Sequence, residues 1–111
     1  MAREVEFTYT LWEINEWLIK VYQRANWNHG PQQFVVLESA INSNRDESHE
    51  IIKYDTEHGI FHVHKYYKKQ KENVNLENKV KGRKNQYRHA VKDITEKGKE
   101  YFKEYRKNKF I

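Results

Sequence analysis

Cysteine is absent from this 111-residue chain, which excludes disulfide bonds and thiolate metal sites. No window approaches the roughly 18 apolar residues that a membrane-spanning helix requires. The first residues also lack the apolar core of a signal peptide. These absences predict a cytoplasmic protein that works without a membrane.

Apolar residues are scarce as well, at 37%, whereas charged residues make up 33%. Three Trp, eight Tyr and five Phe partly compensate, because each aromatic side chain buries a large area. A chain of this length is sufficient for one small domain, which we assign to residues 1–111. Its core would be lean, and assembly into a homodimer would enlarge it.

Charge is unevenly distributed along the chain. Residues 1–57 hold five Lys/Arg and ten Asp/Glu, a net charge of −5, whereas residues 58–111 hold sixteen and six, a net charge of +10. Such asymmetry predicts that the second half binds RNA or another polyanion. A lysine-rich surface that is merely solvated is the alternative.

Strand patterns dominate the first part of the chain. Residues 4–11 alternate strictly between apolar and polar side chains, as in a half-buried strand. Residues 14–27 fit a strand or a helix, and their dense aromatic and β-branched residues slightly favour a strand. A turn at 26–31 then leads to a hairpin, 34–41 with 49–55, and to a further strand at 61–67.

The second part is polar and then helical. Residues 68–86 predict a basic connector with room for one short extra strand. From about 85 to 107, apolar residues recur at three- and four-residue spacing and predict a C-terminal helix. Gly98 lies on its apolar face, where it would permit close packing on the sheet; alternatively it marks a kink, with Thr95 capping a second segment.

The predicted fold class is therefore α+β. It consists of an antiparallel sheet meander of four or five strands, about 4–67, with the C-terminal helix packed on one face.

The chemically active side chains gather between Tyr54 and Tyr67. On a strand, residues i and i+2 share a face, so His62 and His64 would project together. Gly59 permits a sharp reversal, which would fold Asp55 and His58 toward the same edge.

One interpretation of this segment is acid–base chemistry. Histidine titrates near pH 6.5, so one ring can accept a proton while another donates one. This suits metal-independent cleavage of RNA through its own 2′-hydroxyl, with His62 and His64 as the acid–base pair, Asp55 orienting a ring and His58 assisting. No metal and no cofactor enter this assignment. Positive charge would stabilise the phosphorane and hold phosphate, and a tyrosine would stack on bases; the residues assigned to nucleic-acid contact are Lys65, Lys68, Lys69, Arg83 and Tyr66.

Other interpretations remain open. The three histidines and Asp55 could ligate zinc or another divalent ion. Alternatively, the segment is a polar strand face in which Asp55 accepts a backbone N–H two residues on and Gly59 supplies a positive φ. A non-catalytic module that binds nucleic acid or protein through the basic half is the alternative function.

The segment Tyr54–His64 resembles a motif, Y-D-x-x-H-G-x-x-H-x-H, of small uncharacterised prokaryotic proteins. It is also distantly similar to TumE-type toxins of toxin–antitoxin modules, in which a Tyr-Asp pair precedes a Gly and an H-x-H. The resemblance implies an α+β fold, an RNA-directed toxin and a helix-turn-helix antitoxin as partner. By position it covers Tyr54, Asp55, His58, Gly59, His62 and His64.

Overall fold

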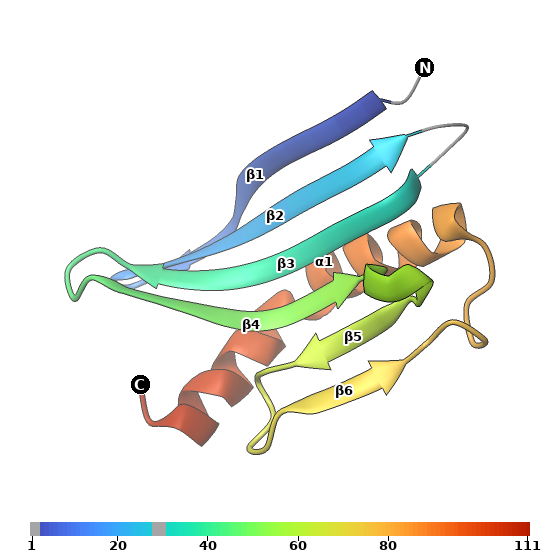
Figure 1. Cartoon of the computed structure of the whole chain (residues 1–111). Coiled ribbons are helices and arrows are strands. Elements are labelled where there is room, and N and C mark those ends of the chain that lie inside the picture. Colours follow the sequence, from blue (N-terminus) through green and yellow to red (C-terminus); the bar gives the residue numbers. More distant parts are fainter. Residues whose placement is uncertain (1–2, 28–30) are drawn as a thin grey trace.

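A computed structural model describes residues 3–27 and 31–111 (Figure 1). In chain order its elements are β1 (Arg3–Ile14), β2 (Trp17–Trp27), β3 (Pro31–Asn42), β4 (Glu47–Asp55), the single 3₁₀ turn η1 (Glu57–Gly59), β5 (His62–Lys65), β6 (Glu72–Asn75) and α1 (Arg83–Lys109). The strands form one antiparallel sheet in sequence order, β1-β2-β3-β4-β5-β6. The predicted α+β meander with a C-terminal helix is confirmed.

The strand count is a correction, because the sheet contains six strands rather than four or five. The sixth, β6, lies inside the predicted basic connector and pairs with β5 through Val63 and Val74. Residues 17–27, which fitted both a strand and a helix, form strand β2. Of the turn expected at 26–31, residues 28–30 lie outside the described part of the chain.

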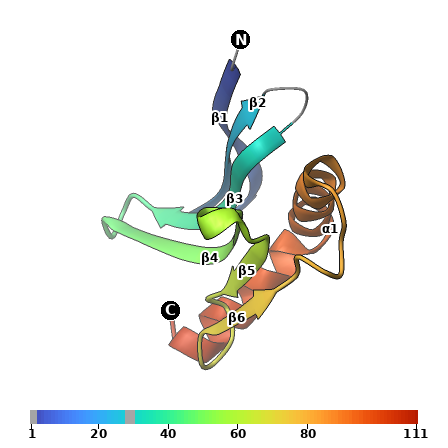
Figure 2. The same ribbon diagram turned by 45° about the vertical axis from the view of Figure 1, so that its right-hand side comes forward.

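The core lies between one face of the sheet and α1, which runs along that face (Figure 2). Alternate residues of β2 and β3 are buried there, among them Ile19, Val21 and Val36. In α1 the buried residues Ala90, Ile94, Gly98 and Phe102 recur every four positions, so they form one stripe along a single continuous helix.

Gly98 allows the close packing predicted for it. A Cβ placed at this position would lie 2.7 Å from Leu11 Cδ2 and 2.7 Å from Glu38 Oε1. The helix therefore rests directly on the side chains of the sheet at this point, without the kink that was the alternative.

The opposite face of the sheet, which we call the open face, carries the candidate site. Tyr54 points toward α1, since its hydroxyl donates to Asp93 Oδ2 at 2.7 Å. Its strand neighbours Lys53 and Asp55 therefore point to the open face. Among the described residues, no helix is both long and apolar enough to span a membrane.

Candidate functional site

The register of β4 and β5 brings the predicted residues together. Asp55 is the Cα partner of His62, and Lys53 is the Cα partner of His64. Directly opposed residues of an antiparallel pair project from the same face with their Cβ atoms about 5 Å apart. Asp55, His62 and His64 consequently meet on the open face.

The reversal between these strands requires left-handed backbone angles. His58 has φ 61° and Gly59 has φ 74°, which confirms the positive φ predicted for the glycine. Contacts on both sides hold the reversal in place. Thr56 Oγ1 accepts the N–H of Phe34 at 3.0 Å, and Arg83 Nη2 donates to the carbonyl of Gly59 at 2.7 Å. The turn is thus fixed to β3 and to the start of α1.

Asp55, His62 and His64 form what we call the Asp–His–His cluster. His62 Nε2 lies 2.8 Å from Asp55 Oδ1, and His64 Nε2 lies 3.4 Å from Asp55 Oδ2. One donor atom from each of the three residues can be chosen so that all lie within 4.8 Å of one another. The Asp55 side chain is 3% exposed and the imidazoles are 18% and 16% exposed. The predicted convergence holds for these three residues.

Both imidazoles are oriented by hydrogen bonds from outside the cluster. His62 Nδ1 lies 2.8 Å from the backbone oxygen of Ile60, and His64 Nδ1 lies 2.8 Å from Asn73 Oδ1. A carbonyl oxygen only accepts, so each Nδ1 carries a proton and donates it. In the neutral ring the lone pair is then on Nε2, facing the Asp55 carboxylate.

The Asp55 carboxylate is only partly satisfied. Oδ1 accepts the backbone N–H of Glu57 at 3.2 Å, which is the turn contact predicted under the structural interpretation. Oδ2 is buried and has no hydrogen-bond partner in the described ranges 3–27 and 31–111. The nearest nitrogen atoms are His64 Nε2 at 3.4 Å and Lys53 Nζ at 3.6 Å. A buried carboxylate oxygen without a hydrogen bond destabilises the fold, and a bound cation would offset this cost.

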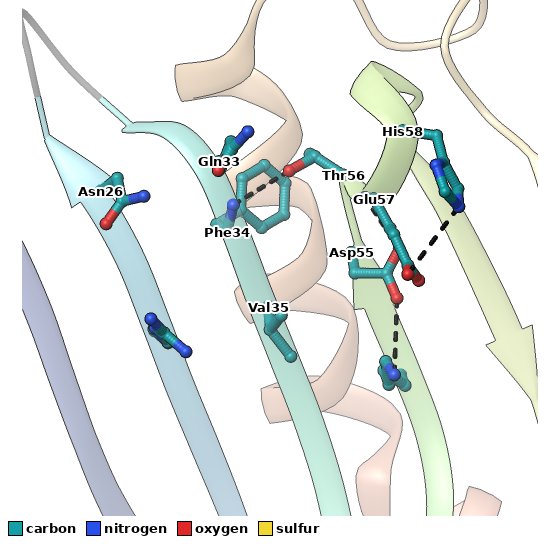
Figure 3. Close-up of a pocket in the computed structure, with 10 residues that line it drawn as sticks. Asn26, Gln33, Phe34, Val35, Asp55, Thr56, Glu57 and His58 are labelled. Atoms are coloured by element: carbon teal, nitrogen blue, oxygen red, sulfur yellow. Dashed lines mark hydrogen bonds and ion pairs between the residues drawn. The ribbon is translucent and has the colours of Figure 1, made fainter.

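His58 does not join the cluster. Its side chain is 85% exposed, and its Nε2 lies 3.8 Å from Glu57 Oε1 (Figure 3). It instead lines a groove of about 480 Å³, which we call the Asp55 groove. The other residues lining it are Arg24, Asn26, Gln33, Phe34, Val35, Lys53, Asp55, Thr56 and Glu57.

One of the predicted nucleic-acid contacts, Tyr66, lies next to the cluster. The Tyr66 ring stacks on His64 with centroids 5.9 Å apart and an interplanar angle of 7°. Lys71 Nζ lies 5.3 Å from the centroid of Tyr66. Burial raises the pKa of Tyr66, so its phenol is neutral at physiological pH. Lys65 follows His64 on β5, so its side chain points to the other face of the sheet, where it pairs with Glu72 at 3.7 Å.

The remaining predicted contacts are Lys68, Lys69 and Arg83, none of which is in contact with the cluster in the described part of the chain. Lys68 lies in the reversal between β5 and β6, where its Nζ is 5.5 Å from the ring centroid of Tyr67, and Lys69 is exposed. The Arg83 guanidinium is engaged within the fold. It donates to Glu77 Oε2 at 2.9 Å, to Gln86 Oε1 at 2.6 Å and to the Gly59 carbonyl. Arg83 therefore positions the turn that carries the cluster.

Lys53 and Asn73 are parts of the site that sequence reasoning missed. Lys53 could have been predicted, because it precedes Asp55 by two residues on the same strand and so shares its face. Asn73 had no such signal, since β6 was not assigned and nothing in a polar segment distinguishes one asparagine from another.

Comparison with known proteins returned no curated protein and no solved structure that matches the chain. One family model, Domain of unknown function (DUF7718), matches residues 2–111. This confirms the prediction of an uncharacterised family, whereas the likeness to TumE-type toxins stays a prediction. The chain belongs to the DUF7718 family.

Proposed function

We propose that this protein cleaves phosphodiester bonds of RNA at the Asp–His–His cluster. The observation that carries the proposal is the convergence of two imidazole Nε2 atoms, at 2.8 and 3.4 Å, on one buried carboxylate. Imidazole and carboxylate groups held this closely are typical of centres that move protons or hold a metal.

The surroundings of the cluster favour an anionic polymer as substrate. The Asp55 groove opens beside it, with Lys53 in its lining. Lys65, Lys68 and Lys69 follow the cluster along the chain, within a half whose net charge is +10. Positive charge of this density attracts nucleic acid, and the aromatic face of Tyr66 beside His64 offers a stacking surface for a base.

Cleavage through the 2′-hydroxyl requires removal of a proton, protonation of the leaving oxygen and stabilisation of the phosphorane charge. In the metal-independent route, one imidazole Nε2 would accept the proton of the 2′-hydroxyl and the other would donate a proton to the leaving oxygen. Asp55 would orient His62. Lys53, which lines the Asp55 groove, would face the phosphate. His58 would contact the substrate from the groove rather than act within the cluster. A toxin-like role, with a helix-turn-helix antitoxin as partner, is the biological setting that we propose.

Incubation of the full chain with total RNA tests this function. We expect the native protein to degrade RNA and the double variant His62→Ala/His64→Ala to lose at least about 100-fold in rate, as removal of a general acid or base does. His89→Ala is the matched control, because His89 is exposed on α1 and packs edge-on against Tyr54 from the helix side. A double variant that cuts as fast as the native protein would refute the assignment.

A non-catalytic RNA-binding module is the second candidate. It is favoured by the same lysines together with the contact between Asp55 and the Glu57 N–H, which gives the carboxylate a purely structural use. This candidate predicts RNA binding by both the native protein and the double variant, with no cleavage by either.

A further inference from the structure

We propose that Asp55, His62 and His64 bind one divalent first-row transition metal ion of the Zn²⁺ type. A metal site formed by Asp55 and three histidines was one of the open interpretations of the sequence; the structure limits its ligands to Asp55, His62 and His64, without His58. The catalytic meaning of such an ion rests on the function proposed above, whereas binding itself does not.

The separations within the cluster suit a shared ion. Zinc binds imidazole nitrogen and carboxylate oxygen at about 2.0–2.2 Å, which places neighbouring ligands roughly 3.0–3.6 Å apart in tetrahedral or octahedral arrangements. The observed separations are 2.8 Å between Asp55 Oδ1 and His62 Nε2 and 3.4 Å between Asp55 Oδ2 and His64 Nε2, and one donor atom of each residue lies within 4.8 Å of the others. Side-chain adjustments that bring these donor atoms to about 2.1 Å from a common point would let one ion bind all three residues on a backbone that the paired strands already hold.

The hydrogen bonds behind the rings are those of metal-binding histidines. Such a histidine nearly always donates its second ring N–H to a carbonyl or carboxylate, which fixes the tautomer and aims the ligating nitrogen. His62 does so to the Ile60 carbonyl and His64 to Asn73 Oδ1, each at 2.8 Å. Two adjacent rings with the same arrangement leave both lone pairs directed at one place.

That place also holds the buried Oδ2 of Asp55, which has no hydrogen bond from any described residue. A second proton on one imidazole would provide a hydrogen bond from that ring to Asp55 and leave the other ring without one. A single cation placed between the two Nε2 atoms and the Asp55 carboxylate would interact with all three groups. Lys53 Nζ, 3.6 Å from Oδ2, is the competing cation; its side chain is 29% exposed and lines the Asp55 groove.

The ligand set also indicates the class of ion. Magnesium and calcium prefer oxygen ligands, whereas two imidazoles and one carboxylate suit zinc and its first-row neighbours. Three protein ligands leave coordination positions open, as in catalytic rather than structural zinc sites. An ion bound here would act as a Lewis acid on a phosphate oxygen or lower the pKa of a bound water.

Calorimetric titration of the full chain with Zn²⁺, after removal of metals with a chelator, tests the proposal. We expect one ion per chain. His62→Ala and His64→Ala should each weaken binding at least about 100-fold, and Asn73→Ala, which removes only the orienting acceptor of His64, about 10- to 100-fold. His89→Ala should bind as the native protein does, because its ring is on the helix side of the sheet.

Far-UV circular dichroism of each metal-free variant establishes that it is folded, and His62→Gln and His64→Gln replace any alanine variant that is not. The visible absorption spectrum of Co²⁺ bound in place of Zn²⁺ provides a second readout, and it should disappear in the His62 and His64 variants. Equal Zn²⁺ affinity in the native protein and these variants would overturn the proposal.

The two proposals fail in different ways. RNA cleavage that persists in excess chelator and is lost in the double variant keeps the proposed function and overturns a catalytic role for the ion, whereas the metal site itself is overturned by equal Zn²⁺ affinity in the native protein and the histidine variants. Stoichiometric Zn²⁺ binding that depends on His62 and His64, without RNA cleavage, keeps the metal site and overturns the proposed function.

Discussion

The orientation of His62 and His64 depends on two acceptors outside the cluster, the Ile60 carbonyl and Asn73 Oδ1. Both exist only because β5 lies between the η1 reversal and β6. The geometry of the cluster therefore depends on the segments that flank β5, because they hold each ring through Nδ1, on the side away from Asp55.

Gly59 provides a direct test of that dependence. Its φ is 74° and a Cβ added there would meet no atom within 4 Å, so Gly59→Ala would introduce backbone strain without a steric clash. We expect a loss of about 1–2 kcal/mol in the free energy of unfolding, measured by urea denaturation. A variant as stable as the native protein would show that the left-handed angle is not required.

At this scale the sequence predicted much of the site. Alternation on a strand and a reversal at a glycine were sufficient to bring Asp55, His62 and His64 together. His58 could not be placed in this way, because its own φ of 61° puts it in the turn, where strand alternation does not apply. Its side chain consequently points to solvent.

At the scale of elements, the contact between α1 and the sheet contains a buried carboxyl group. Glu38 on β3 is fully buried, and neither of its carboxyl oxygens has a hydrogen-bond partner in the described part of the chain. Burial, with a smaller contribution from the nearby Asp93 carboxylate, raises the pKa of Glu38 to about 9. Asp93 itself accepts hydrogen bonds from Tyr54 and Tyr101, each at 2.7 Å.

The raised pKa of Glu38 predicts how stability depends on pH. Between its ordinary value of 4.5 and about 9, the folded protein keeps this proton and the unfolded chain does not. Stability is then greatest below pH 4.5 as far as this group is concerned, and it falls as pH rises toward 9. Glu38→Gln, which mimics the neutral acid, should remove this fall and be more stable by about 2 kcal/mol or more at pH 8.

Urea denaturation of both proteins at pH 5 and pH 8 measures this difference. Glu50→Gln is the control, because Glu50 lies on the neighbouring strand with an exposed side chain. A difference between Glu38→Gln and the native protein that is equal at the two pH values would contradict the buried neutral acid.

Elements were predictable where packing gives them a pattern. The stripe of α1 and the alternation of β1 are such patterns, and α1 extends only two residues beyond each predicted end. β6 lacked one, because three of its four residues are polar and only Val74 anchors it. Its pairing with β5 uses backbone hydrogen bonds, which any sequence can form and which therefore leave no pattern in the sequence. For β2, the strand form is fixed by partners on both edges, β1 and β3, which a local window does not include.

At the scale of the whole molecule, the change of charge sign coincides with the cluster. Strands β1 to β4 belong to the acidic half of the chain, whereas β5, β6 and α1 belong to the basic half. Asp55 comes from the first half and the two histidines from the second. A polyanion attracted to the basic half would therefore contact the cluster, because the cluster lies where the basic and acidic halves of the chain meet.

The salt dependence of RNA binding tests where the polymer lies. For single strands, each phosphate contact contributes about 0.7 to the slope of log affinity against log salt concentration. If RNA runs past the cluster, replacing Lys53, Lys68 and Lys69 by Ala should reduce this slope by about 2. The matched control replaces three exposed lysines of α1, Lys92, Lys97 and Lys107. A reduction confined to the α1 triple variant would place RNA on the helix and contradict the proposed site.

Histidine side-chain ¹⁵N NMR spectra of the full chain, recorded before and after one equivalent of Zn²⁺, report on both imidazoles of the cluster at once. We expect His62 and His64 both to carry a proton on Nδ1, and their Nε2 signals alone to move together and saturate at one equivalent. Nε2 signals of these two residues that stay unchanged, or that move only with all six histidines at excess metal, would contradict a shared centre on the open face.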